Sequence, residues 1–287
     1  SAASDVYKRQ GTCSRRREPR VVSDSHLNDR QLLRYSRQIF LPEVDQEGQE
    51  RLAGARVLVV GLGGLGSPVA LYLAAAGVGT LVLSDPDSVE LSNLQRQILH
   101  TTPALGRRKT ESAREALTAL NPEISILTHA CKLTDSALLD EVAAADLVVD
   151  GTDNFESRFA VNRACVVSRT PLIYGAVVRL EGQVSVFRPD QPDGPCYACL
   201  YRDAGEHPDG AGVPSSWENC TGQGVLGPVA GLVGCIQATE ALKLLTGAGT
   251  VLAGRLLLID AAAMEFQSFH LEKDPDCRVC GGSATGV

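Results

Sequence analysis

Four of the nine cysteines in this 287-residue chain form two pairs with the spacing C-x-x-C. Cys196 and Cys199 make the first pair, and Cys277 and Cys280 make the second. Four thiolates are the tetrahedral ligand set that zinc prefers, although the long separation requires the fold to bring the two pairs together. Neither pair has the Cys-Gly-Pro-Cys sequence typical of a redox helix. We therefore expect a structural zinc site, with a redox pair or free thiols as the alternative.

A glycine-rich turn is a second place where residue spacing suggests chemistry. Gly61, Gly63 and Gly66 follow the pattern G-x-G-x-x-G between an apolar run at 56–60 and a helical pattern at 67–76. The first glycine permits a tight turn, the second lets the backbone approach a phosphate, and the third lets the helix pack on the strand. The amino end of that helix offers unpaired N–H groups and a partial positive charge to an anion.

An acidic residue completes this predicted nucleotide-binding unit. A second apolar run, at 80–83, is followed by Asp85, whose carboxylate suits a ribose hydroxyl. Strand, glycine turn, helix, second strand and acid together predict a β-α-β unit that binds a nucleotide. The alternative is a glycine-rich turn with no ligand.

Two basic residues, Arg96 and Lys109, follow the acid on the side of the sheet where phosphates would lie. A triphosphate needs several positive charges, whereas the pyrophosphate of a dinucleotide needs few beyond the helix N-terminus. This excess of charge favours ATP over NAD. The alternative is that both residues are ordinary exposed charges.

A third carboxylate, Asp153, follows a predicted strand at 146–150. In doubly wound folds, ligands bind at the carboxyl ends of the strands. Asp153 is therefore placed to hold Mg²⁺ on phosphate oxygens. The alternative is that Asp153 only caps the predicted helix at 157–168.

Strands and helices alternate along the chain, which predicts an α/β fold with a Rossmann-like, doubly wound and mainly parallel sheet. The strand at 182–187 alternates apolar and polar residues and indicates an antiparallel extension. The other expected strands are 56–60, 80–83, 124–130, 146–150, 172–176 and 256–260. The expected helices are 27–40, 46–52, 67–76, 109–120, 136–144, 157–168 and 228–245.

Composition narrows the class of protein. A hydrophobic content of 44% predicts a folded core, and a net charge of −7 argues against nucleic acid as a partner. The most apolar stretch, at 225–245, carries Gln237, Glu240 and Lys243, so we interpret it as a buried helix and expect no membrane partner. Nine cysteines without a secretion signal indicate a reducing compartment, the cytoplasm.

The predicted organisation is a disordered extension at 1–26 and a single domain at 27–287. Within that domain, the nucleotide-binding part covers about 54–175, and the zinc part, which would also bind a protein partner, covers about 176–281.

With these motifs assembled, residues 32–281 resemble the adenylyltransferases that activate ubiquitin-like sulfur-carrier proteins in the molybdopterin and thiamine pathways, relatives of the ubiquitin-activating enzymes. The resemblance rests on matching blocks at 34–38, 61–66, 92–97 and 152–154, on Lys109, and on both cysteine pairs.

The resemblance implies a role for each matching residue. The phosphates would lie against the turn that contains Gly61, Gly63, Gly64 and Gly66, and the ribose would bind Asp85. Asn93, Arg96 and Lys109 would serve the triphosphate, and Asp153 the magnesium. The matching blocks also contain four further residues that would bind the nucleotide: Ser92, Leu94, Gln95 and Asn154. Arg37 would reach the ATP of a neighbouring subunit in a homodimer, and the four paired cysteines would hold Zn²⁺.

The implied reaction joins AMP to the C-terminal glycine of a carrier with a Gly-Gly tail and releases pyrophosphate. The α-carboxylate of the carrier has a pKa of about 3.3–3.7, so it is ionised and needs no general base. Cys220 is expected to be unnecessary for adenylation and to act, if at all, in later sulfur transfer. The molybdopterin carrier and the thiamine carrier stay open as substrates. Two different functions also stay open: an NAD-dependent oxidoreductase and a non-catalytic scaffold that binds the carrier.

Overall fold

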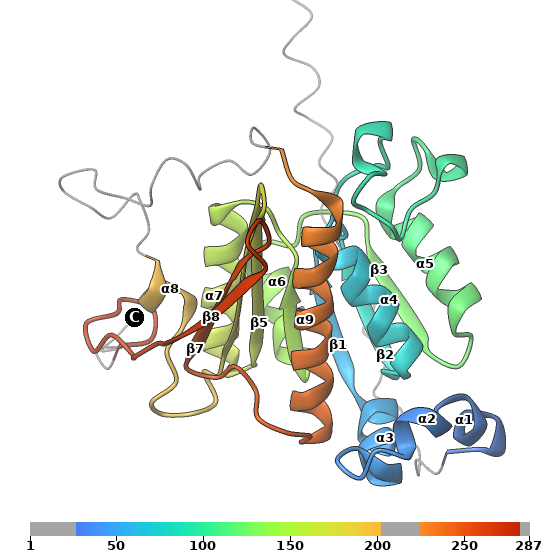
Figure 1. Cartoon of the computed structure of the whole chain (residues 1–287), viewed down its shortest axis with the longest axis horizontal. Helices are drawn as coiled ribbons and strands as arrows, with labels where there is room; N and C mark the ends of the chain where they lie inside the picture. The colour runs from blue at the N-terminus through green and yellow to red at the C-terminus, as the bar shows by residue number, and fades with distance from the viewer. Residues whose placement is uncertain (1–26, 202–223, 282–287) are drawn as a thin grey trace, which may run out of the picture.

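Eight strands form one sheet with the order β3-β2-β1-β4-β5-β6-β7-β8. The computed structural model describes residues 27–201 and 224–281, so the predicted extension at 1–26 and Cys220 lie outside the described residues. Strands β3, β2, β1, β4 and β5 are parallel to one another, and β6, β7 and β8 continue the sheet in antiparallel pairing. The prediction of a mainly parallel sheet with an antiparallel extension is confirmed (Figure 1).

The strands are β1 (Arg56–Val60), β2 (Thr80–Ser84), β3 (Ser125–His129), β4 (Leu147–Asp150), β5 (Leu172–Val178), β6 (Glu181–Phe187), β7 (Arg255–Asp260) and β8 (Glu265–His270). The described α-helices are α1 (Asp29–Arg34), α2 (Ser36–Ile39), α3 (Asp45–Gly54), α4 (Gly66–Ala76), α5 (Lys109–Leu120), α6 (Asp135–Ala144), α7 (Phe155–Ser168), α8 (Tyr197–Leu200) and α9 (Gly227–Thr246). Short 3-10 turns occur at η2 (Leu91–Asn93) and η3 (Thr102–Ala104).

Helices cover both faces of the parallel strands, with α4 and α9 on one face and α6 and α7 on the other (Figure 1). In β1, Val57 and Val59 belong to the core cluster that includes α4 and α9. Leu58 points to the opposite face and belongs to the cluster that includes α6 and α7. Burial on both faces explains why β1 is a continuous apolar run without alternation.

Helix α9 has the length and apolar composition of a membrane span, and half of it is buried inside the fold. It packs against α4, β5 and β6. The Gln237 amide donates to the carbonyl of Asp150, and buried Glu240 accepts from Lys243 and from the N–H of Leu252. The Gln237 nitrogen, Glu240 and Lys243 therefore have partners within the protein, as expected for a buried helix.

The helix predicted at 27–40 is divided at Tyr35 into α1 and α2. The tyrosine is buried, its hydroxyl accepts a hydrogen bond of 2.8 Å from Asn121 Nδ2, and a Cβ atom on Gly77 would lie 2.5 Å from its ring. The prediction of one continuous helix is wrong because tertiary packing of this side chain overrides local helix propensity.

Candidate functional site

The glycine turn between β1 and α4 has a geometry that larger residues would prevent. Gly61 has a φ angle of +89°, in the region that favours glycine. A Cβ atom on Gly66 would lie 1.8 Å from the carbonyl oxygen of Gly61, so the start of α4 packs directly on the turn. A Cβ atom on Gly63 would meet only Gln97 Nε2, at 3.8 Å. The backbone at Gly63 is therefore open to the space in front of the turn.

Asp85 follows β2 and is joined to the glycine turn. Its carboxylate accepts hydrogen bonds from the N–H of Leu62 at 2.7 Å and of Asp87 at 2.8 Å. Burial raises the pKa of this carboxyl group, and the nearby Lys109 charge and the two hydrogen bonds oppose the rise. The acid is thus held in place by the same backbone that forms the turn.

Lys109 is the first residue of α5, and its side chain is only 6% exposed. Its Nζ atom lies 2.8 Å from Oδ2 of Asp87 and 3.8 Å from Oδ1 of Asp85. The alternative that Lys109 is an ordinary exposed charge is wrong. A buried ammonium requires compensating charges, and these two carboxylates supply them.

Arg96 is oriented by the turn at η2. Its guanidinium donates to the carbonyl of Ser92 at 3.2 Å and to Oδ1 of Asn93 at 3.3 Å. The same Asn93 oxygen accepts from Gln97 at 2.8 Å, and its amide nitrogen donates to Glu90 at 3.3 Å. The sequence block at 92–97 therefore forms a local network that holds a half-buried guanidinium group.

The loop between β4 and α7 presents Asp153 as an exposed carboxylate. The helix is capped by the next residue, Asn154, whose Oδ1 accepts from the N–H of Ser157 at 2.9 Å. The alternative that Asp153 caps this helix is therefore wrong. Asp153 Oδ1 accepts a bond of 3.3 Å from the amide of Asn154, and its other oxygen is available to a ligand.

Arg158 on α7, which the sequence analysis did not single out, fixes this loop through a hydrogen bond to its backbone. It is 3% exposed, donates to the carbonyl of Thr152 at 3.0 Å, and lies 5.6 and 5.7 Å from the ring centroids of Phe155 and Tyr174. Burial raises the pKa of Asp150, and the Arg158 charge opposes that rise. The available signal was an arginine facing the apolar side of a helix just after the acidic loop.

His100 is a second residue that the sequence analysis missed. Its Nε2 atom lies 3.2 Å from the carbonyl oxygen of Leu62, and its Nδ1 atom lies 3.0 Å from the hydroxyl of Ser112 on α5. Since a carbonyl only accepts, Nε2 carries hydrogen and Nδ1 accepts from the serine. Burial lowers the pKa of this imidazole. His100 thus ties the glycine turn to the helix that begins with Lys109.

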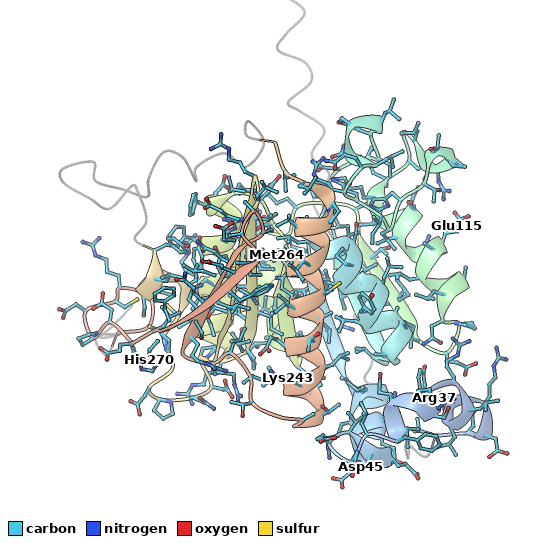
Figure 2. All side chains as sticks on the ribbon, viewed as in Figure 1. Arg37, Asp45, Glu115, Lys243, Met264 and His270 are labelled. Carbon is cyan, nitrogen blue, oxygen red and sulfur yellow. The ribbon has the colours of Figure 1, made fainter. Side chains whose placement is uncertain are left out.

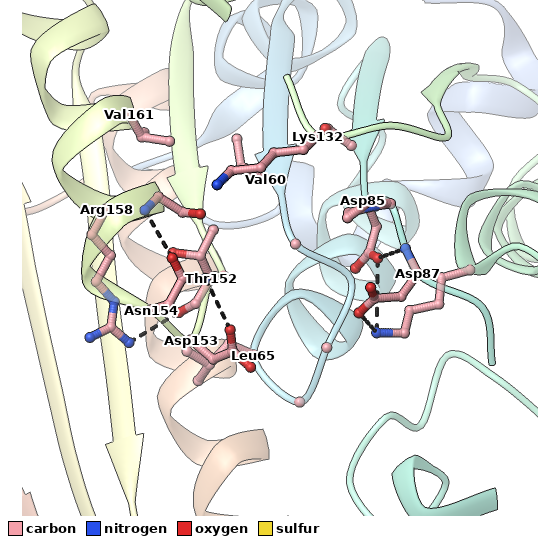
Figure 3. Close-up of a pocket in the computed structure, with 18 of the residues that line it drawn as sticks. Val60, Leu65, Asp85, Asp87, Lys132, Thr152, Asp153, Asn154, Arg158 and Val161 are labelled. Atoms are coloured by element: carbon pink, nitrogen blue, oxygen red, sulfur yellow. Dashed lines mark hydrogen bonds and ion pairs between the residues drawn. The ribbon is translucent and has the colours of Figure 1, made fainter. Parts of the chain in front are cut away.

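The glycine turn, Asp85, Arg96, Lys109, Asp153 and Arg158 line a cavity of about 770 Å³ at the carboxyl ends of the parallel strands. Figure 3 shows Asp85 and Asp87 on one side, the loop with Asp153 and Asn154 on the other, and the end of β1 between them. The predicted site residues that line the cavity are Gly61, Gly63, Gly64, Asp85, Asn93, Gln95, Arg96, Lys109, Asp153 and Asn154. Gly66, Ser92, Leu94 and Arg37 do not line it.

Arg37 lies on α2, beside the amino ends of the parallel strands and away from the cavity of its own chain (Figure 2). Its neighbours in the motif anchor the segment: Tyr35 bonds Asn121, and Gln38 donates to Gln49 and to the carbonyl of Ala76. The arginine side chain itself is exposed. The motif at 34–38 therefore fixes the backbone and leaves Arg37 at the surface.

The fold brings the two cysteine pairs together into one cluster. The Sγ atoms of Cys196, Cys199, Cys277 and Cys280 all lie within 4.8 Å of one another. The separations are 3.8 Å for Cys196–Cys277, 4.0 Å for Cys199–Cys196 and 3.4 Å for Cys199–Cys280. Tetrahedral coordination at a Zn–S distance of about 2.3 Å requires sulfurs about 3.8 Å apart. The cluster fits a Zn²⁺ ion.

The pKa values of two thiols in the cluster are shifted in opposite directions. Hydrogen bonding with Cys196 lowers the pKa of Cys199, whereas hydrogen bonding with Cys196 and Cys199, together with burial, raises the pKa of Cys280. Adjacent thiols cannot all ionise without a positive charge among them. A divalent ion would remove this conflict.

Comparison with known proteins places this arrangement in a family. The family model described as "ThiF family" matches residues 35–279. The chain belongs to the ThiF family. Among ThiF-family relatives, the sulfur carrier protein ThiS adenylyltransferase of Escherichia coli strain K12 is 48% identical over 90% of this chain and 98% of its own length. The molybdopterin-synthase adenylyltransferase of the same strain is 45% identical over 90% of this chain and 99% of its own length.

A solved structure of Escherichia coli MccB with ATP has a fold similar to this ThiF-family chain. The TM-score is 0.71 at 26% identity, over 86% of this chain and 74% of the MccB chain. The similarity therefore extends over most of the described fold.

Proposed function

We propose that this protein is an adenylyltransferase that activates a ubiquitin-like sulfur-carrier protein. It would join AMP from ATP to the C-terminal glycine carboxylate of the carrier and release pyrophosphate. The observation that carries the proposal is the cavity at the strand ends, which is lined by the glycine turn, Arg96, Lys109 and Asp153. The similarity of the chain to two named adenylyltransferases supports it.

The charges around the cavity suit this reaction. The carrier carboxylate is already ionised, so the barrier comes from repulsion between anions and from charge on the departing pyrophosphate. Lys109, fixed by buried contacts, and Arg96, oriented by Asn93, would stabilise that charge without reorganisation. Backbone N–H groups at the start of α4 would add to this stabilisation. Positioning of the two reactants supplies the remaining acceleration.

Asp153 would hold Mg²⁺, because its exposed carboxylate at the cavity wall is the kind of oxygen ligand that this ion prefers. When bound, the ion would neutralise phosphate charge. The cysteine cluster would hold Zn²⁺ in a structural role, because four protein ligands leave no open coordination position. A zinc–thiolate site is compatible with a reducing compartment, and we propose the cytoplasm.

A homodimer would complete the site. Arg37 is exposed and distant from the cavity of its own chain, so it could serve an ATP site only in another subunit (Figure 2). We propose that two copies associate so that each Arg37 reaches the phosphates bound by its partner, which adds a cation to the cavity.

The relatives support the molybdopterin carrier and the thiamine carrier equally. The deciding experiment is ATP–pyrophosphate exchange with both purified carriers, each ending in Gly-Gly, assayed in parallel with a carrier that lacks the last glycine. Exchange that requires one intact carrier identifies the substrate. The absence of exchange with either carrier, by protein that binds ATP, would contradict the proposed reaction for these two substrates.

A further inference from the structure

Asn162 lies on α7 between the nucleotide cavity and the cysteine cluster. Its sequence neighbours Val161 and Arg163 line the cavity. Its own side chain is 1% exposed and contacts the first cysteine pair. A buried carboxamide must find partners for its donors and its acceptor, so these contacts determine its role.

Both ends of this amide are used on the segment that begins α8. Nδ2 donates to Sγ of Cys196 at 3.6 Å, and Oδ1 accepts from the N–H of Tyr197 at 2.9 Å. One side chain thus fixes a metal-ligand sulfur and the peptide that follows it. The N–H of Tyr197 lies in the first turn of α8, where backbone donors have no partner within the helix.

The sulfur that Asn162 contacts has little access to water. Cys196 is 1% exposed, and its Sγ atom lies next to those of Cys277 and Cys199. A buried thiolate among other sulfurs needs hydrogen-bond donors from the protein, because burial without them is costly. An amide N–H donor stabilises the ionised sulfur and fixes its direction.

We propose that Asn162 is a positioning residue of the metal site, which orients the Cys196 sulfur toward Zn²⁺ and fastens the first cysteine pair to the helix that lines the nucleotide cavity. The inference rests on the proposed zinc site and is independent of the adenylation reaction. Loss of a residue that orients a metal ligand typically weakens metal binding by about 10- to 100-fold.

The test compares three variants of the zinc-loaded, full-length protein. Asn162→Asp is isosteric and keeps the acceptor for Tyr197 but removes the donor for Cys196. Asn162→Leu removes both. Phe159→Leu is the control, because Phe159 is buried on α7 with its ring centroid 5.1 Å from that of Tyr197, yet it makes no hydrogen bond to the cluster. Circular dichroism establishes that each variant is folded.

The first measurement is the rate of zinc transfer to a chromogenic chelator. We expect about 10- to 100-fold faster release from Asn162→Leu, acceleration in Asn162→Asp, and a rate near wild type for Phe159→Leu. The second measurement uses cobalt-substituted protein. A sulfur that loses its hydrogen bond is a better electron donor, so the thiolate-to-cobalt band should move to lower energy in both Asn162 variants and stay unchanged in the control.

Two failures are distinguishable. Wild-type protein that binds neither zinc nor cobalt would overturn the zinc site itself. Zinc-loaded wild type, with release rates and cobalt spectra unchanged in both Asn162 variants, would overturn only the role of Asn162. Equal acceleration by Phe159→Leu, with no spectral change in any variant, would reduce Asn162 to a packing residue and also overturn the proposal.

Discussion

The Nζ atom of Lys109 lies 2.8 Å from Oδ2 of Asp87, and the lysine side chain is 6% exposed whereas the aspartate side chain is 65% exposed. The cation is therefore fixed by the fold, while its partner faces the solvent. In the proposed mechanism, a phosphate could replace Asp87 at the ammonium without any movement of Lys109. A charge that is already in position costs no reorganisation when it acts.

We predict that Lys109→Ala lowers carrier-dependent pyrophosphate exchange by roughly 10²-fold or more, the scale for loss of one preorganised electrostatic group. The matched control is Arg107→Ala, because Arg107 lies two residues earlier and pairs with Glu115 outside the cavity. Exchange in the control should stay near wild type. Equal activity of both variants would remove Lys109 from the mechanism.

We predict that Asp153→Ala also lowers exchange by roughly 10²-fold or more, because it removes the proposed magnesium ligand. A magnesium titration at fixed ATP should show that the variant needs a higher ion concentration for half-maximal rate. Glu156→Gln is the control, since this acid lines the same cavity but its carboxylate pairs with Lys132 at 2.7 Å. An unchanged magnesium requirement in Asp153→Ala would contradict the assignment.

Mixing two inactive variants tests the role of Arg37 across subunits. Arg37→Ala and Lys109→Ala should each be inactive alone, and subunit exchange between them should restore activity. The mixed dimer contains one site with both residues intact, so about a quarter of the wild-type rate is the most that random exchange can recover. Mixing differently tagged copies of Arg37→Ala is the control. Exchanged dimers without activity would show that Arg37 does not act in trans.

The cysteine cluster predicts one zinc ion per chain, measurable by metal analysis of purified protein. Cys277→Ser should reduce the zinc content strongly, because it removes one of four ligands whose sulfurs lie within 4.8 Å. Cys235→Ser is the control, since this cysteine on α9 is outside the cluster. Full zinc content in Cys277→Ser would contradict the four-cysteine site.

Glu141 on α6 should make stability depend on pH. Hydrogen bonds lower the pKa of this carboxyl from 4.5 to about 2 in the folded state. The bond from His129 contributes most, and the bond from Arg56 contributes less. Its contribution is therefore present above the unfolded value and is lost as the pH falls from 4.5 toward 2. We expect wild type to exceed Glu141→Gln by about 2 kcal/mol in the free energy of unfolding at neutral pH.

Urea unfolding of both proteins at neutral pH and at about pH 3 measures this difference. The gap should shrink at the lower pH. Comparing the two proteins under the same conditions cancels other acid-sensitive groups. A gap that is independent of pH would contradict the assigned pKa.

Local chemistry made much of the site predictable. The turn at Gly61 and the apolar run of β1 follow from short-range rules, because the turn requires glycine and burial on both faces requires consecutive apolar residues. The choice between Asp153 and Asn154 as helix cap could not be predicted, because adjacent acid and amide side chains cap equally well. Strand β8 was missed because its residues are exposed on both faces and carry no alternating pattern.

Long-range contacts account for the remaining differences. Nothing near Tyr35 in the sequence indicates that its ring lies against Gly77, which divides the expected helix. His100 binds Leu62 and Ser112 from outside any recognisable motif. Arg158 lies on the apolar side of its helix, but its contact with the ring of Tyr174 on β5 depends on how the two elements pack. Such contacts depend on how elements pack, which a single sequence does not display.

The cysteine cluster joins parts of the chain that are 81 residues apart, and the segment between them includes α9 and β7. A bound ion would therefore act as a crosslink that closes a long loop in the unfolded chain. By analogy with a disulfide that closes a loop of this length, the loss of chain entropy would be worth about 4.5 kcal/mol. Removal of the metal would then loosen first the two segments that carry the four cysteines, residues 196–200 and 271–281, and expose them to proteases, while α9 stays packed against α4, β5 and β6.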